Sequence, residues 1–171
     1  MGTGAGQIVF EDDIAAIEDS SSDKPAGRMV QSGAQTGILN NVLTACTFTT
    51  EDFDTHGFHS TSVLTSRVTP TVSGLYDVRG GVSITGQTDY TTVEAVIRFN
   101  GNAIAPAHRI TPSAGSQTLV IPATAFVVCN GSTDYFEIAF RLQRSGAGTS
   151  GTVVSSQFAS VLEWAKERDL V

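Results

Sequence analysis

The 171-residue sequence predicts one all-β domain, an antiparallel two-sheet sandwich of Greek-key or jelly-roll type, preceded by a short arm. Three observations support this fold class. Apolar and polar residues alternate over several runs, as in strands that bury one face. Asn-Gly pairs separate these runs, and such pairs form tight turns. After Gly27, no segment shows the 3.6-residue period of a long helix.

The alternation is clearest in Leu75–Ile84, Val93–Phe99 and Tyr135–Leu142, which we expect to be half-buried strands. The segment Gln117–Cys129 is apolar on both faces, so it is predicted as a central strand, with a bend or bulge at Pro122. The remaining predicted strands are Met29–Gln31, Asn41–Phe48, Ser66–Val68, Asn102–Ile110 and Val153–Trp164. We expect hairpin turns at Asn100-Gly101 and Asn130-Gly131.

Residues 1–27 form a separate acidic arm, and residues 28–171 form the sandwich domain. The arm holds six acidic residues and one lysine, so it carries a net charge of −5 out of −7. One short helix is expected from Ile14 to Ile17, capped by Asp12 or Asp13 and too short to be stable alone. The arm is either a frayed tail or a docking arm that orders on assembly. The docking interpretation uses its apolar residues Ile8, Val9, Phe10, Ile14 and Ile17.

Composition excludes several classes of function. With a net charge of −7 and a pI near 4.7, the chain has little to attract a phosphate backbone, so no nucleic-acid partner is expected. No apolar run is long enough to span a membrane, and the start lacks a secretory signal. Cys46 and Cys129 lie far apart without metal-ligand spacing, which indicates reduced, buried thiols in a protein made in a cytoplasm.

The densest polar cluster is Glu51–His59, with three carboxylates and two imidazoles. Such side chains can hold a divalent cation, but the spacing matches no calcium loop and no zinc helix. The alternative is a polar connection whose Phe53 and Phe58 plug the core, with His56 and His59 available for a symmetry interface. We expect no metal and no cofactor.

Catalytic motifs are weak. Gly146–Gly151 spells G-x-G-x-x-G, but a strand follows where a dinucleotide site needs a helix, so we interpret it as a loop. Besides the two clustered histidines only His108 could serve as a base, both cysteines fall in predicted core strands, and there is no G-x-S-x-G elbow. Paired carboxylates for glycoside chemistry stay open, because such pairing is spatial. The chain is predicted not to be an enzyme.

One strand carries a more specific pattern. In Thr69–Val78, the residues Pro70, Gly74, Tyr76 and Val78 resemble the P-x-x-x-G-x-Y-x-V strand of C1q/TNF-like jelly rolls, and also its version in bacteriophage structural proteins. Gly74 allows the turn into the strand, and the Tyr76 ring can fill the core with its hydroxyl near the rim.

Neighbouring segments extend the resemblance to roughly residues 25–164. Phe53–His59 and Arg67–Pro70 are similar to the lead into that strand in the phage proteins, and Ser156–Trp164 to the last strand of the family. Gln7–Ile17, followed by Pro25–Gln31, is similar to the opening of phage head and tail proteins.

The resemblance implies a homotrimer of jelly rolls that binds and does not catalyse, with Tyr76, Phe158 and Leu162 in the core or at the trimer axis. The function expected from it is a decoration protein (minor capsid or cement) on a phage head. Its arm would bind the major capsid protein, and it would be assembled in the host cytoplasm. The alternative is a tail-fibre or receptor-binding tip for a host glycan or protein, for which Tyr90 is the one candidate loop aromatic. A lectin-like hydrolase is a third class.

Overall fold

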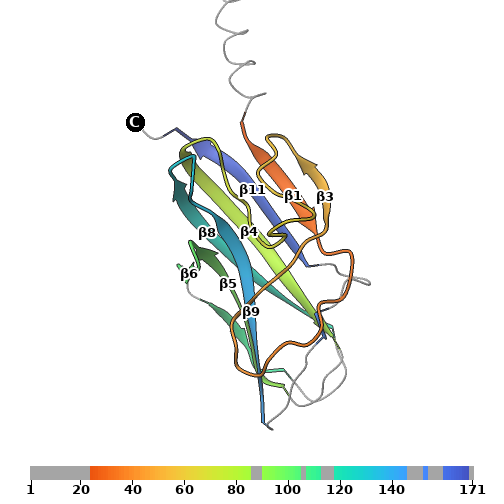
Figure 1. Ribbon diagram of the computed structural model, residues 1–171. Coiled ribbons are helices and arrows are strands. Elements are labelled where there is room, and N and C mark those ends of the chain that lie inside the picture. Colours follow the sequence, from red (N-terminus) through yellow and green to blue (C-terminus); the bar gives the residue numbers. More distant parts are fainter. Residues whose placement is uncertain are drawn as a thin grey trace, which may run out of the picture.

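The computed structural model describes residues 24–85, 90–104, 107–112, 118–145, 152–153 and 160–169. Within these ranges all regular structure is β, arranged as two antiparallel sheets that pack face to face (Figure 1). The all-β sandwich prediction is therefore confirmed. The predicted helix and the apolar residues of the arm lie outside the described residues. No helix among the described residues is long and apolar enough to cross a membrane.

The first sheet has the strand order β3-β1-β11-β4-β8, and short β10 pairs with β4 beyond the start of β11. The second sheet has the order β2-β9-β5, with β6 and β7 both on the far edge of β5. The strands of the first sheet are β1 (Ala26–Val30), β3 (Thr50–Asp54), β4 (Gly74–Thr85), β8 (Leu119–Cys129), β10 (Thr152–Val153) and β11 (Val161–Arg168). Those of the second are β2 (Thr44–Ala45), β5 (Tyr90–Phe99), β6 (Asn102–Ala103), β7 (His108–Ile110) and β9 (Phe136–Arg144).

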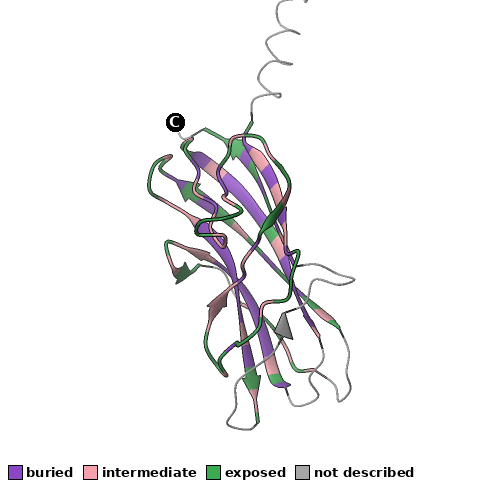
Figure 2. Ribbon diagram, turned by 45° about the vertical axis from the view of Figure 1, so that its right-hand side comes forward, coloured by how far each residue is buried: buried purple, intermediate pink, exposed green. Residues whose placement is uncertain are grey.

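The core lies between the sheets, where the inward residues of β1, β4, β5, β8, β9 and β11 are buried (Figure 2). Alternation places Phe136, Ile138, Phe140 and Leu142 of β9 on this side, as predicted. A chain of aromatic rings crosses the core, from Phe58 to Tyr76, then Phe136, then Trp164, with centroid separations of 6.3, 6.2 and 6.3 Å. These separations are typical of favourable tilted and edge-to-face contacts, which add to the stabilisation from burial alone.

The predicted central strand at 117–129 is an edge strand, which corrects the sequence interpretation. Among the described residues, β8 pairs only with β4, and its register runs without a shift past Gly81↔Pro122, so Pro122 makes no bulge. Proline cannot donate to a ladder, so an edge strand accommodates it well. The prediction failed because apolar residues on both faces were taken to mean burial on both faces.

The two Asn-Gly pairs form different turns. Asn100 and Gly101 both have positive φ, 49° and 81°, and they join β5 to β6 in the predicted two-residue hairpin. Asn130-Gly131 instead connects β8 in one sheet to β9 in the other, so it is not a hairpin turn. There Asn130 Oδ1 accepts the amides of Ser132 and Thr133 at 2.9 and 3.0 Å, a side-chain-capped turn.

Other predicted strands are shorter or shifted. The predicted strand 153–164 corresponds to β10 and to β11, which continues to Arg168, while 154–159 lies outside the described residues. In the predicted strand 66–68, the structure gives only isolated bridges of Val68 to His59 and to Phe136.

Candidate functional site

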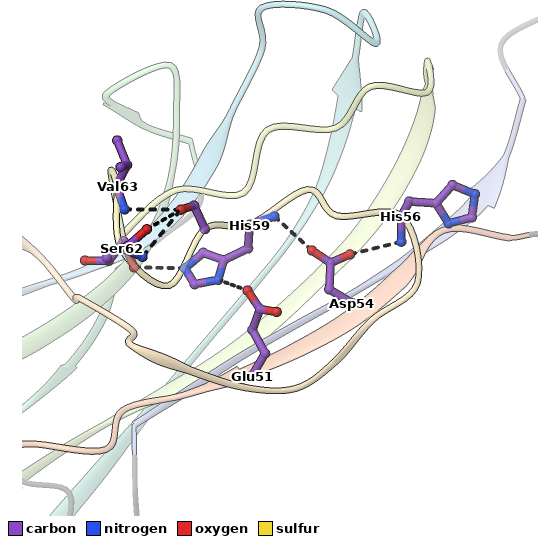
Figure 3. Close-up of polar contacts among 8 residues, drawn as sticks. Glu51, Asp54, His56, His59, Ser62 and Val63 are labelled. Carbon is purple, nitrogen blue, oxygen red and sulfur yellow. Dashed lines mark hydrogen bonds and ion pairs between the residues drawn. The ribbon is translucent and has the colours of Figure 1, made fainter.

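The polar cluster Glu51–His59 lies at the end of β3 and in the connection to β4 (Figure 3). Asp54 accepts the backbone amide of His59 at 2.9 Å with one carboxylate oxygen and that of His56 at 3.2 Å with the other. Gly57 has φ +65°, which lets the chain reverse between these two amides. The carboxylate of Asp54 therefore fixes the loop, and this local role explains its place in the cluster.

The His59 side chain is fully buried, and both of its ring nitrogens have partners. Nδ1 lies 2.6 Å from Glu51 Oε1, and Nε2 lies 3.1 Å from the carbonyl oxygen of Thr65. A catalytic histidine needs one ring nitrogen directed at a nucleophile or substrate, and a metal ligand needs one free lone pair. With both nitrogens occupied by acceptors, His59 does neither, and it holds the connection against β3.

Only part of the alternative interpretation of this cluster matches the structure. Phe58 fills the core as expected, but Phe53 does not, because it is 49% exposed on β3. His59 is enclosed by the chain and unavailable to a symmetry interface, whereas His56 is partly exposed and packs against the Phe58 ring at 5.6 Å. In the part of the chain that the structure describes, no three His, Cys, Asp or Glu side chains come together as a metal site.

The two cysteines are buried free thiols, one in each half of the chain. Burial raises the pKa of the Cys46 thiol and that of the Cys129 thiol to about 12. The thiolate is the nucleophilic form, so at neutral pH neither side chain supplies a nucleophile.

The outward side of the first sheet, called here the outer face, exposes large apolar side chains. Phe126 of β8 is 66% exposed, and Val120 and Val128 on the same strand and Phe53 on β3 are about half exposed. Large apolar groups gathered on one face of a sheet are a mark of an interaction surface. This face is therefore the strongest candidate for a binding site among the described residues.

Two hollows lie on the outer face, on either side of Arg79. One, of about 420 Å³, lies over β1, β11 and β3 and is lined by small residues such as Ala26 and Ala165 together with Phe53. The other, of about 450 Å³, lies beside β8 and is lined by Phe126, Pro122 and His108, among others. Asp77 and Arg79 line both hollows.

Charged groups of both signs lie along the first hollow and between it and the second. Arg28 pairs with Glu163 at 2.8 Å and also with Asp52, and Arg79 pairs with Asp77 two residues before it. Most of these side chains are a third or more exposed, but the Asp77 side chain is only 9% exposed while Arg79 is 70% exposed. A face with both signs of charge can complement a second copy of itself.

The predicted site residues fall into two groups. The arm residues Ile8, Val9, Phe10, Ile14 and Ile17, and also Phe158, lie outside the described residues. Tyr76 and Leu162 are completely buried between the sheets, and the Tyr76 hydroxyl donates to the Val72 carbonyl at 2.7 Å. Sequence reasoning placed Phe53 in the core and missed Phe126. The signal for the second was the two-faced apolar run at 117–129, had it been considered for an edge strand.

Comparison with known proteins gives a fold and no closer relative. No family model matches the chain, and no curated protein sequence matches it. Among solved structures, murine APRIL at pH 5.0 is similar with a TM-score of 0.62 and 9% identity, over 85% of this chain and 100% of that one. Eiger TNF from S. frugiperda is similar with a TM-score of 0.55 and 11% identity, over 86% of this chain and 95% of that one.

These likenesses cover most of the chain at identities that carry the fold alone. The chain itself has two packed antiparallel sheets and a buried Gly-x-Tyr strand. The chain therefore has a C1q/TNF-like jelly-roll fold.

Proposed function

We propose that this chain is a non-enzymatic structural protein that forms homotrimers and decorates a phage head as a minor capsid or cement protein. The observation that carries the proposal is the outer face of the first sheet, with its exposed Phe53 and Phe126 and two hollows. Absence of catalysis is supported by the closed hydrogen bonding of His59 and by the buried, non-nucleophilic thiols.

The arrangement of the outer face favours a head-to-tail contact. Phe126 projects from the edge strand β8, whereas the hollow lined by Ala26 and Ala165 lies over β1 and β11, on the other side of β4. A protruding ring on one copy can enter this hollow on the next copy. Because the two patches differ, the contact is heterologous, and repetition around an axis closes a ring. Three copies is the number that the family resemblance implies.

The base of the arm is fixed at one end of the sandwich, which gives the proposed trimer a direction. The amide of Lys166 donates to the Pro25 carbonyl at 2.8 Å, and the Ala26 amide donates to Thr55 Oγ1 at 2.9 Å. The start of β1 is thus held between β11 and the end of β3. In a trimer the three arms leave from the same end, and we propose that they bind the major capsid protein there. This places the protein on the head surface of the virion, after assembly in the host cytoplasm.

The oligomeric state tests the first half of the proposal. Sedimentation velocity of the full chain should give a trimer, and Phe126→Ser should shift it toward monomer while leaving the circular dichroism spectrum unchanged. A side chain this exposed contributes little to the fold of its own chain. A monomeric wild-type chain at micromolar concentration would contradict the trimer.

The location of the chain on the virion tests the second half of the proposal, which is binding to the phage head. Gold-labelled antibody on intact virions should spread over the head, and deletion of residues 1–24 should abolish head binding while leaving a folded trimer. Label confined to the tail tip would instead support the receptor-binding alternative. Tyr90, the aromatic residue suggested for that alternative, is not available to a ligand. It is only 7% exposed, and the Arg144 guanidinium carbon lies 5.7 Å from the centre of its ring.

A further inference from the structure

The Ser60–Ser66 loop, between β3 and β4, presents two adjacent apolar side chains to solvent. Val63 is 65% exposed and Leu64 is 62% exposed, close to the value for Phe126. All other residues of the loop are serine or threonine, so it carries no charge. Burial of apolar side chains is favourable, and a pair exposed together at a loop tip therefore requires an explanation beyond folding.

The backbone at Leu64 is held in an unfavourable conformation. Its φ is +51°, in the left-handed region, where the Cβ atom crowds the backbone. The other non-glycine residues with positive φ in the described part of the chain are Asn41 and Asn100, and asparagine tolerates this region. Leucine has no side-chain polar group to offset the strain, so this apolar residue lowers the stability of the fold.

The surrounding structure fixes this loop from several directions. The Thr65 carbonyl accepts the Phe48 amide at 2.8 Å and faces His59 Nε2 at 3.1 Å. Ser66 Oγ donates to the buried carboxylate of Glu137 at 3.1 Å. Ser60 Oγ accepts the amide of Val63, which is labelled in Figure 3, at 3.1 Å. Strain of this kind persists only where the rest of the structure imposes it, and it concentrates where chains bind partners. The buried His59–Glu51 pair therefore helps to hold the loop tip in place, because His59 also contacts the Thr65 carbonyl.

We propose that the Ser60–Ser66 loop is a preformed knob that inserts Val63 and Leu64 into an apolar pocket of a protein partner. The inference rests on the proposed function, which makes that partner the shell protein of the phage head. A membrane is disfavoured as the partner because the loop has no Lys or Arg and the chain carries a net charge of −7. A second copy is disfavoured because no residue of the loop lines either of the two hollows proposed for the contact between copies.

A stabilising substitution tests the knob. Leu64→Asn places a residue that tolerates positive φ at this position, so the midpoint of thermal unfolding should rise. The same variant should bind undecorated phage heads about tenfold more weakly or worse, because truncation of a buried anchor costs at least this much. Val63→Ser should weaken binding without raising the midpoint. Leu39→Ser is the matched control, since Leu39 is 53% exposed on a different loop and should leave binding unchanged.

The outcomes separate this inference from the proposed function. If the wild-type chain does not bind undecorated heads, both fail. If the wild-type chain binds and Leu64→Asn and Val63→Ser bind equally well, the knob is wrong and the decoration function stands. Co-sedimentation of the wild-type chain, but not of Leu64→Asn, with phosphatidylcholine vesicles would overturn the protein partner in favour of a lipid surface.

Discussion

The solvent-facing sides of the two sheets differ: that of the second sheet carries buried, paired carboxylates, and that of the first carries exposed aromatic side chains. On the second sheet, the Glu94 side chain is 7% exposed and receives hydrogen bonds from Arg141 and Arg109, and Glu137 is 4% exposed and pairs with Arg98 at 3.0 Å. On the first sheet, Phe53 and Phe126 are exposed, and the charged groups beside them are mostly open to water.

The difference shows which of the two faces is stabilised by contacts within the chain. Buried carboxylates are stable only when they are paired, and the second sheet supplies both partners from its own strands. The outer face of the first sheet leaves apolar area uncovered, so its free energy falls only if another molecule covers it. The same fold thus contains one face stabilised by the chain itself and one that another copy can stabilise.

The largest expected effect is on the second sheet, from Glu137→Ala. Removing this carboxylate leaves Arg98 without its ion-pair partner and Ser66 without its acceptor, so the free energy of unfolding should fall by about 3 kcal/mol. Urea denaturation at one fixed protein concentration measures it. A loss below about 1 kcal/mol would mean that the second sheet does not depend on this buried pair, and the comparison above would fail.

A slightly smaller effect, on association, is expected for Ala165→Arg on the first sheet. Ala165 is exposed and lines the hollow over β1 and β11, so a long charged side chain there should block the hollow and leave the fold intact. Loss of this central contact should weaken each subunit–subunit contact of the proposed trimer by about 2 kcal/mol, or roughly 30-fold in the dissociation constant of that contact.

Mixing two variants sharpens this test. Ala165→Arg keeps Phe126, and Phe126→Ser keeps the hollow, so an equimolar mixture should form a dimer through one intact contact and stop there. Analytical ultracentrifugation distinguishes this dimer from monomers. If the mixture stays monomeric while each variant is folded, the head-to-tail contact is incorrect, even if the outer face is still the interface.

The sequence predicted the sandwich and its core because alternation reports which side of a strand is buried, as in Phe136–Leu142 of β9. It did not reveal strand neighbours, which depend on pairing between distant segments, so β8 was placed at the centre of a sheet. For the same reason the outer face could not be found. Phe53 and Phe126 are far apart in sequence, and they share one face only because three strands, β1, β11 and β4, pair between β3 and β8. The hydrogen bonding of His59 could not be predicted from the sequence either. Its partner at Thr65 is a backbone carbonyl oxygen, which every residue type has.

The pH dependence of stability should also differ between the two faces. Burial alone raises the pKa of Glu94, but the hydrogen bonds and charges of Arg141 and Arg109 outweigh it, and the pKa is lowered. A carboxylate with a lowered pKa in the fold adds stability above the ordinary glutamate range, and this is lost as the pH falls through that range toward the folded value. Glu94→Gln should therefore flatten the decline in stability between about pH 5 and pH 3. An unchanged slope would show that Glu94 is not among the groups that set acid stability.

The smallest effect is expected from Glu163→Gln, which removes the charge from an ion pair on the outer face. Glu163 pairs with Arg28 at 2.8 Å, a geometry as good as that of Glu137 with Arg98, but its side chain is 50% exposed. Because water already solvates both partners, the free energy of unfolding should change by less than about 0.5 kcal/mol. Urea denaturation of Phe126→Ser with and without Glu163→Gln measures this in a background shifted toward the monomer. A loss of unfolding free energy comparable to that of Glu137→Ala would mean that solvent exposure does not distinguish the ion pairs of the two faces. The charged side chains of the outer face would then stabilise the fold of the single chain, and they would not be available mainly for contact with a second copy.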